Sequence, residues 1–122
     1  MTRILIVDDA ATVRLYHRAI LEGAGFTVDE AVNGVEALEK AFTTSYGLFI
    51  VDVNMPKLDG YGFMRELRSN GAAQAPAIMV STEAEAADHD KAYAVGANVY
   101  LVKPVKPDQL VRHARMLLGV RS

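Results

Sequence analysis

The chain has 122 residues, which is the length of one folded domain of ordinary size. Its composition is 51% hydrophobic and 23% charged, which excludes a disordered chain and predicts a packed core. The formal net charge of -2 gives no general attraction for nucleic acid or anionic membranes, and the absence of cysteine excludes disulfides and thiolate metal sites. The N-terminal residues predict neither a signal peptide nor a membrane span, so we expect a cytoplasmic protein without membrane insertion.

Short apolar runs alternate along the chain with longer segments whose apolar residues recur at helical spacing. In chain order, the pattern predicts a strand over 4–7, a helix from 11 that the glycines at 23 and 25 end, a strand over 27–31, a helix over 35–42, a strand over 48–51, a helix over 63–67, a strand over 77–80, a helix over 86–95, a strand over 98–102 and a helix over 107–118. No internal repeat or linker interrupts this alternation. We therefore expect one domain over residues 1–122.

The regular alternation of strand and helix predicts an α/β fold with a parallel sheet covered on both faces. Because parallel crossovers are almost always right-handed, five such units favour a flavodoxin-like doubly wound sheet with strand order 2-1-3-4-5 and five helices. Ligands of such sheets bind at the carboxyl ends of the strands, between the first and third strands. The polar residues at the strand ends are therefore the candidates for function.

Five polar residues follow the predicted strands: Asp8 and Asp9 after the first, Asp52 after the third, Ser81 after the fourth and Lys103 after the fifth. Three carboxylates in one cleft repel one another unless a cation offsets their charge. Mg²⁺ is the cation that prefers oxygen ligands and commonly joins carboxylates to a phosphate. The sequence therefore predicts a Mg²⁺ site at this edge of the sheet.

A lysine and a hydroxyl group beside the carboxylates indicate phosphoryl chemistry. The ammonium group of Lys103 and the hydroxyl of Ser81 are donors that suit the oxygens of a phosphoryl group. Carboxylates act as phosphoryl acceptors in aspartyl-phosphate chemistry. Asp52 is the candidate nucleophile, because it ends the central strand between the predicted metal ligands and the lysine.

At this point the sequence resembles the receiver domain of two-component response regulators over essentially its whole length. The resemblance is carried by four segments in order: Ile6-Val7-Asp8-Asp9, Val51-Asp52-Val53-Asn54-Met55-Pro56-Lys57-Leu58-Asp59-Gly60, Met79-Val80-Ser81 and Tyr100-Leu101-Val102-Lys103-Pro104. The four together are far more specific than any one of them.

The resemblance implies a phosphorylated aspartate and its metal. Asp52 would accept a phosphoryl group from a histidine kinase. Asp9, Asp52 and the backbone carbonyl of Asn54 would bind Mg²⁺, with Asp8 assisting through water. Asn54 and Glu83 stand at the positions that tune self-dephosphorylation, and their combination is similar to that of chemotaxis receivers with short-lived phosphates.

The resemblance also implies a conformational switch. Lys103 would pair with the phosphoryl group, aimed into the cleft by a cis bond to Pro104. Ser81 would hydrogen-bond a phosphoryl oxygen, and Tyr100 would turn inward when Ser81 moves. The sequence departs from the commonest pattern at Val105, where an aromatic residue is usual, and in having Ser81 where threonine is frequent.

The function implied is that of a stand-alone response regulator that signals by binding another protein when phosphorylated. It is not an enzyme in the ordinary sense, since it would catalyse only its own phosphorylation and dephosphorylation. A chemotaxis-type role ranks first among stand-alone roles. The alternatives are a phosphorelay intermediate or phosphate sink, which would exchange phosphate with a histidine phosphotransfer protein, and a receiver fragment of a larger regulator.

The partner surface is expected on the fourth helix, fifth strand and fifth helix. Acidic residues on or just before the fourth helix are Glu83, Glu85, Asp88 and Asp90, and basic residues beyond Tyr100 are Lys103, Lys106, Arg112, Arg115 and Arg121. The contrast could steer a target peptide or a second receiver. Solvated charge explains most of these residues equally well.

Simpler structural roles remain open for several of these residues. Asp8 and Asp9 could cap the first helix, Ser81 and Thr82 could cap the fourth, and Tyr100 could be a packed strand residue that never moves. The histidines at 17, 89 and 113 lack metal-ligand spacing, so we expect solvated side chains and no phosphorelay histidine.

Two enzyme or cofactor functions are disfavoured by specific residues. A Mg²⁺-dependent aspartyl-phosphate phosphatase usually needs a second carboxylate close behind the nucleophile, but Asn54 stands at that spacing from Asp52. A flavodoxin-like cofactor binder needs a phosphate-binding loop, and no glycine-rich loop follows the first strand.

Overall fold

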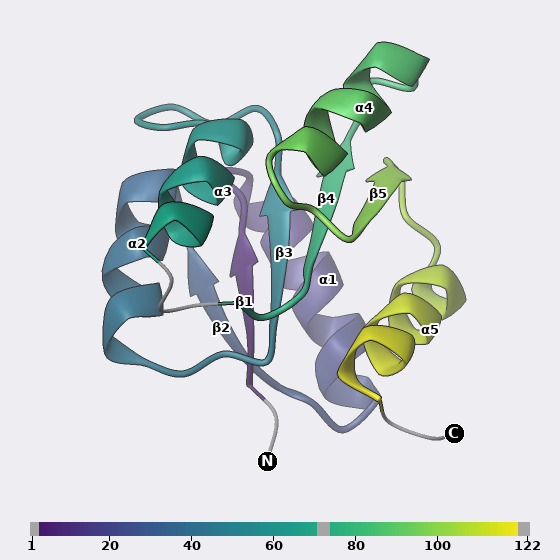
Figure 1. Cartoon of the computed structure of the whole chain (residues 1–122). Helices are drawn as coiled ribbons and strands as arrows, with labels where there is room; N and C mark the ends of the chain where they lie inside the picture. The colour runs from purple at the N-terminus through teal and green to yellow at the C-terminus, as the bar shows by residue number, and fades with distance from the viewer. Residues whose placement is uncertain (1–2, 71–73, 120–122) are drawn as a thin grey trace.

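A computed structural model describes residues 3–70 and 74–119 of the chain. Five parallel strands form one sheet in the order β2-β1-β3-β4-β5, and helices follow them in strict alternation (Figure 1). In chain order the elements are β1 (Arg3–Val7), α1 (Ala11–Gly23), β2 (Thr27–Ala31), α2 (Gly34–Thr43), β3 (Leu48–Asp52), α3 (Gly60–Ser69), β4 (Ala77–Ser81), α4 (Ala86–Ala94), β5 (Val99–Val102) and α5 (Pro107–Leu118). The predicted doubly wound α/β fold is confirmed. Arg121, one of the basic residues of the expected partner surface, lies outside the described residues.

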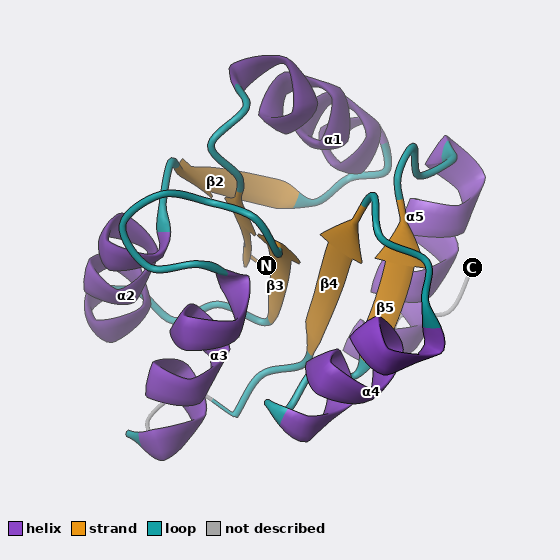
Figure 2. Ribbon diagram, turned by 90° about the horizontal axis from the view of Figure 1, so that it is seen from above, coloured by secondary structure: helices purple, strands orange, loops and turns teal. Residues whose placement is uncertain are grey.

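Helices cover both faces of the sheet, as the continuous apolar strands predict. Helices α1 and α5 lie on one face, and α2, α3 and α4 lie on the other (Figures 1 and 2). Successive residues of a strand point to opposite faces. In β1, Ile4 and Ile6 accordingly pack with Leu21 of α1 and Leu110 of α5, while Leu5 belongs to the core on the opposite face. The central strands are buried on both sides, which fixes the positions of the residues at their ends.

The third helix is longer than the predicted span of 63–67. The Asp59 side chain is its N-cap and accepts a hydrogen bond from the Gly62 backbone N–H at 2.8 Å. A cap of this kind satisfies one of the free donors at a helix start. The helix therefore begins at Gly60, directly after the loop that leaves Asp52.

Among residues 3–70 and 74–119, no helix is long and apolar enough to cross a membrane.

Gly60 lets α3 approach the end of β3 very closely. Its backbone N–H donates to the Val53 carbonyl oxygen at 2.9 Å. A Cβ at position 60 would lie 2.9 Å from the Val53 Cα and closer still to the Asp52 carbonyl oxygen. This close packing therefore requires a residue without a side chain at position 60. It allows the hydrogen bond from Gly60 that holds the loop next to the candidate nucleophile in place.

We expect Gly60→Ala to lower the free energy of unfolding by about 1–3 kcal/mol, because the new methyl group has to displace backbone. Gly23→Ala is the matched control, since it places a methyl group at the end of α1 with nothing within 4 Å. The control should be neutral or more stable by up to about 1 kcal/mol. Urea unfolding of both variants measures this, and equal stability of Gly60→Ala and the parent chain would refute the packing requirement.

Candidate functional site

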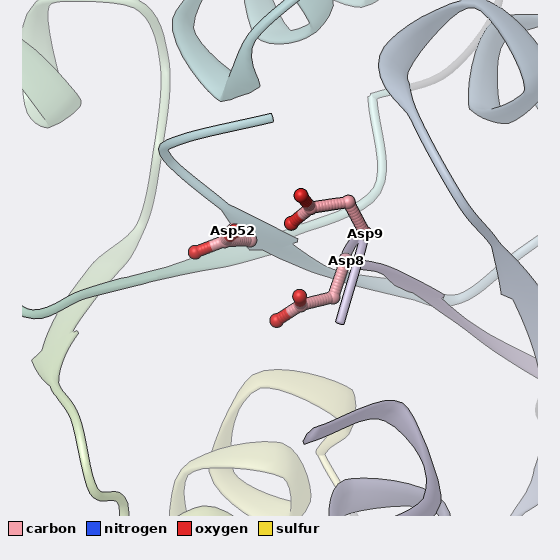
Figure 3. A group of neighbouring side chains, drawn as sticks. All are labelled: Asp8, Asp9 and Asp52. Atoms are coloured by element: carbon pink, nitrogen blue, oxygen red, sulfur yellow. The ribbon is translucent and has the colours of Figure 1, made fainter. Parts of the chain in front are cut away.

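Three carboxylates meet at the carboxyl edge of the sheet. Asp52 is the last residue of β3, and Asp8 follows β1 directly. Both are buried, with 5% and 1% of their surfaces exposed, whereas Asp9 is exposed. One carboxylate oxygen from each residue lies within 4.8 Å of the others, and the three side chains surround a common space (Figure 3). The juxtaposition predicted from the strand order is confirmed.

Lys103 reaches the same cluster from the segment after β5. Its Nζ lies 2.8 Å from Asp52 Oδ1 and 3.2 Å from Asp8 Oδ2, so it donates to both buried carboxylates. The peptide bond between Lys103 and Pro104 is cis, as predicted. The predicted ends of β1, β3 and β5 therefore contribute to one site.

The cluster carries more negative than positive charge. Burial raises the pKa of Asp52 above its ordinary value, and the nearby charge of Asp8 adds to the rise even though Lys103 opposes it. Burial would lower the pKa of Lys103, but its hydrogen bond to Asp52 and the charges of Asp52 and Asp8 raise it overall. A raised pKa favours the protonated form of each group, so the cluster is stabilised by added positive charge.

The donor set fits a hard divalent cation. All three acidic side chains offer oxygen, the ligand type that Mg²⁺ prefers, and no sulfur or imidazole belongs to this carboxylate group. Asn54, the fourth predicted ligand, lies two residues beyond Asp52 and is exposed. The part assigned to its backbone carbonyl stays a prediction.

Ser81 and Tyr100 are joined through the backbone of a single residue, Glu83. Ser81, buried at the end of β4, accepts a hydrogen bond from the Glu83 N–H at its Oγ, at 3.1 Å. The Tyr100 hydroxyl donates to the Glu83 carbonyl oxygen at 2.7 Å, and its side chain is buried. The sequence singled out Glu83 for its side chain, but this backbone link was not predicted, because backbone hydrogen bonds leave no signature in residue type.

The simpler capping roles are wrong for both pairs. The N-cap of α1 is Ala10 and that of α4 is Glu85, and neither forms a side-chain cap hydrogen bond. Asp8 Oδ1 instead accepts from the Ala10 N–H at 2.9 Å, which tightens the turn after β1. Asp8 and Ser81 thus shape the loops that border the site.

The expectation of solvated histidines is wrong for His17, which is only 2% exposed. Its position one helical turn before buried Leu21 places both on the inner face of α1. Burial lowers the pKa of His17, so its imidazole is neutral at pH 7. His89 is half-buried with its ring centroid 4.3 Å from that of Tyr100, and His113 is half-buried on α5.

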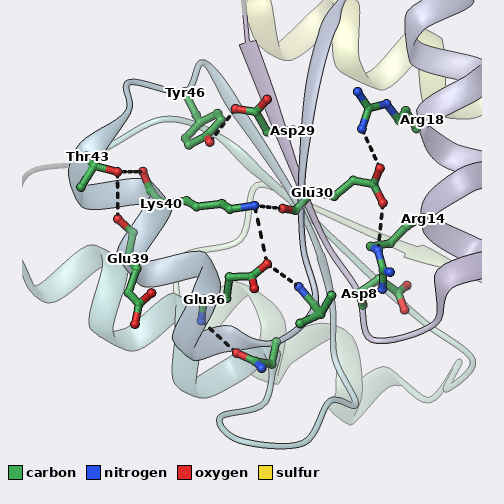
Figure 4. A network of polar contacts seen from close by, with 12 residues as sticks. Asp8, Arg14, Arg18, Asp29, Glu30, Glu36, Glu39, Lys40, Thr43 and Tyr46 are labelled. Atoms are coloured by element: carbon green, nitrogen blue, oxygen red, sulfur yellow. Dashed lines mark hydrogen bonds and ion pairs between the residues drawn. The ribbon is translucent and has the colours of Figure 1, made fainter.

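Arg14 supports the site and was not predicted. Its guanidinium donates to the Asp8 carbonyl oxygen at 2.7 Å and to Glu30 Oε1 at 2.9 Å (Figure 4). Arg18 donates to the other Glu30 oxygen at 2.6 Å, and Lys40 contacts the Glu30 carbonyl. The backbone of Asp8 is therefore fixed by a network that extends to β2 and α2. Glu30 could not be recognised from the sequence, because it stands in an ordinary strand segment far from Arg14 along the chain.

Comparison with known proteins places this site in a known family. Residues 4–115 match the response regulator receiver domain family. The chain is 37% identical to the transcriptional regulatory protein ResD of Bacillus subtilis over 96% of this chain and 48% of that protein. It is 40% identical to the sensor protein EvgS of Escherichia coli K12 over 93% of this chain and 9% of that protein. The chain thus spans about half or less of the length of these curated relatives.

Solved structures give the same result at the level of the whole chain. The chemotaxis response regulator CheY4 of Vibrio cholerae is similar with a TM-score of 0.90 and 34% identity, covering 96% of this chain and 98% of that one. The response regulator TrrA of Thermotoga maritima, solved in complex with Mg²⁺ and BeF, is similar with a TM-score of 0.86 and 32% identity, covering 96% of this chain and 99% of that one.

We expect Asp52→Asn to raise the free energy of unfolding at pH 7 in metal-free buffer. Since the folded-state pKa of Asp52 is raised, its ionised form costs stability above that pKa. The cost disappears as the pH falls below the ordinary value of 3.8, where the carboxyl is neutral in both states. Chemical denaturation at several pH values measures the difference between variant and parent, and a variant that is less stable at pH 7 contradicts this account.

Replacing Arg14 by methionine should cost about 1–3 kcal/mol of stability, because the Asp8 carbonyl and one Glu30 oxygen lose their partner. Arg18→Met is the control: Arg18 also pairs with Glu30, but its side chain is 36% exposed against 14% for Arg14. The control should cost less than about 1 kcal/mol. Equal losses in the two variants would show that the contact with Asp8 contributes nothing.

Proposed function

The chain belongs to the response regulator receiver domain family, and we propose from this that it accepts a phosphoryl group on Asp52 from a histidine kinase in a Mg²⁺-dependent reaction. The observation that carries the proposal is the contact of 2.8 Å between Lys103 Nζ and Asp52 Oδ1 inside the group of three carboxylates. A buried nucleophile, a fixed ammonium group and an oxygen donor set occur together in one place.

The residues support transfer to the carboxylate directly. Asp52 Oδ1 is held by Lys103, and its second oxygen has no hydrogen-bond partner within residues 3–70 and 74–119. This oxygen would form the new bond to phosphorus while the bond from phosphorus to the nitrogen of the donor histidine breaks, and the histidine leaves with the bonding electrons. Bound Mg²⁺ would supply positive charge to the phosphoryl oxygens. Lys103 would then move from the carboxylates to the transferred group.

Output would be protein binding. A phosphoryl group on Asp52 would accept a hydrogen bond from the Ser81 hydroxyl and would draw this side chain away from the Glu83 N–H, from which its Oγ now accepts. The Glu83 carbonyl oxygen also accepts from the Tyr100 hydroxyl, so a change at Ser81 would reach Tyr100 through the backbone of one residue. Tyr100 lies on β5, and its ring contacts that of His89 on α4. Both residues belong to the α4–β5–α5 surface on which the partner is expected. This link would be a two-state element whose populations phosphorylation shifts.

We propose a stand-alone chemotaxis-type regulator as the first role. The similarity to the Vibrio cholerae chemotaxis protein over 98% of that protein supports it. The alternative of a receiver within a larger regulator is supported by ResD, of which the chain matches 48%. Transfer of phosphate from Asp52 to a histidine phosphotransfer protein would favour a phosphorelay role instead. In each case the chain would catalyse only its own phosphorylation and dephosphorylation.

Acetyl phosphate with Mg²⁺ tests the phosphoryl acceptor, with intact mass as the readout. We expect one phosphoryl adduct on the parent chain, none on Asp52→Asn and none when EDTA removes the metal. Asp59→Asn is the matched control, because asparagine caps α3 as well as aspartate does and Asp59 is exposed. An adduct on Asp52→Asn, or no adduct on the parent chain, would refute the assignment.

The lifetime of that adduct tests the assignment of Asn54 and Glu83. Both side chains are exposed to solvent, from which the attacking water would come. We expect the phosphorylated chain to lose its phosphate within minutes after acetyl phosphate is removed in the presence of Mg²⁺. Radiolabel that persists for hours under these conditions contradicts the short lifetime without affecting the identity of the acceptor.

A further inference from the structure

Helix α4 lies beside β5 and is attached to the sheet by few of its own side chains (Figure 2). Ala92 is its one buried residue, and most of the others are exposed. His89 stands one helical turn before Ala92, so both belong to the inner face of the helix. His89 is half-buried there and has much the larger side chain of the two. Its ring is therefore a principal contact between α4 and β5.

The residue that His89 contacts is Tyr100, which is expected to move in the proposed switch. The two ring centroids lie 4.3 Å apart at a tilt of 47°. This pair is closer than Tyr46 and Phe49 in the core, whose centroids lie 5.7 Å apart. Tyr100 is 5% exposed, and its hydroxyl donates to the Glu83 carbonyl oxygen. The ring and the hydroxyl of Tyr100 are thus held by different groups, the His89 imidazole and the Glu83 backbone.

A histidine at this position can place a positive charge on the contact. Imidazole ordinarily changes its charge between pH 5 and 8. A cation within about 6 Å of an aromatic centroid is attracted to the face of the ring, and the separation of 4.3 Å lies inside that limit. The attraction exists only while the ring of Tyr100 lies against His89. Protonation of His89 would therefore stabilise the buried position of Tyr100 relative to any position in which the two rings separate.

The surroundings of His89 carry more negative than positive charge. The titratable groups near it are Glu83, Glu85, Asp88, Asp90 and Lys91 from α4 and the loop before it, Tyr100 from β5 and Tyr61 from α3. None of the four acidic residues forms an ion pair within residues 3–70 and 74–119. The Nζ of Lys91 instead lies 4.9 Å from the ring centroid of Tyr61. A positive imidazole is therefore compatible with the charges around it.

We propose that His89 is a positioning residue for Tyr100: its protonated imidazole holds the tyrosine ring in the buried position, so that lower pH favours the form of the α4–β5–α5 surface in which Tyr100 is inward. The proposal rests on the proposed function in one respect, the part of Tyr100 in output. Acid and phosphorylation would then act on the same element. A partner that selects the inward form would bind more tightly at pH 6 than at pH 8 when the extent of phosphorylation is equal.

The proton affinity of His89 measures this coupling directly, because coupling between two equilibria is reciprocal. NMR titration of the whole unphosphorylated, metal-free chain follows each imidazole separately. We expect Tyr100→Leu, which removes the ring, to lower the proton affinity of His89 about threefold, whereas Tyr100→Phe keeps the ring and should leave it unchanged. His113 on α5, across the sheet from α4, is the internal control and should titrate alike in all three proteins (Figure 2).

The solvent exposure of the Tyr100 ring tests the same coupling from the other side and needs no substitution at Tyr100. A soluble gadolinium chelate broadens the NMR signals of exposed rings. Broadening of the Tyr100 signals should increase as the pH rises through the titration of His89. His89→Gln keeps a polar side chain but cannot become charged, so it should abolish the increase. This measurement decides the question if Tyr100→Leu does not fold.

The proposal is overturned if Tyr100→Leu folds and leaves the proton affinity of His89 unchanged, or if Tyr100→Phe lowers it as much as Tyr100→Leu does. It is also overturned if the broadening of Tyr100 does not depend on pH in the parent chain, or still depends on pH in His89→Gln. All of these outcomes are read without Mg²⁺ or a phosphoryl group. Acetyl phosphate should modify His89→Gln as it modifies the parent chain, so a failure here leaves the assignment of Asp52 untouched.

Discussion

The structure depends on a repulsion that the fold does not relieve by itself. Asp8 and Asp52 are buried next to one another, Asp9 adds a third carboxylate, and Lys103 supplies one positive charge among them. The parallel sheet forces this arrangement, because β1, β3 and β5 all end at the same edge. The proposed binding of a divalent cation, and with it of a phosphoryl group, depends on this excess negative charge.

The surrounding structure holds this unfavourable cluster in place. Arg14 fixes the Asp8 backbone from α1, and Gly60 allows α3 to pack against the end of β3. The strands that carry Asp8 and Asp52 are buried on both faces, so the carboxylates cannot separate without opening the core. Two single hydrogen bonds through the Glu83 backbone join Ser81 at the end of β4 to Tyr100 of β5. The proposed signalling role requires that the carboxylates stay fixed while these two hydrogen bonds change.

The sequence was most informative where burial and chemistry coincide. Residues 4–7 and 48–51, which precede Asp8 and Asp52, are all apolar. The two buried strands, their places in the sheet and the meeting of the carboxylates at their ends could therefore be predicted from the sequence. The early start of α3 was missed although the capping residue Asp59 is visible, because helical periodicity begins only inside the helix. His17 was misjudged because a polar residue on the inner face of α1 contradicts its pattern. Partners such as Glu30 for Arg14 depend on tertiary packing, which one sequence does not encode locally.

The most direct test of this account is the stability of the chain as a function of Mg²⁺ concentration. Urea unfolding at pH 7 should show the free energy of unfolding rising with Mg²⁺ by about 1.4 kcal/mol for each tenfold increase once the site is saturated. Sodium chloride at matched ionic strength controls for general screening. A stability that rises with Mg²⁺ well beyond the sodium control would confirm that a divalent cation relieves the carboxylate repulsion. Equal effects of the two salts would contradict it.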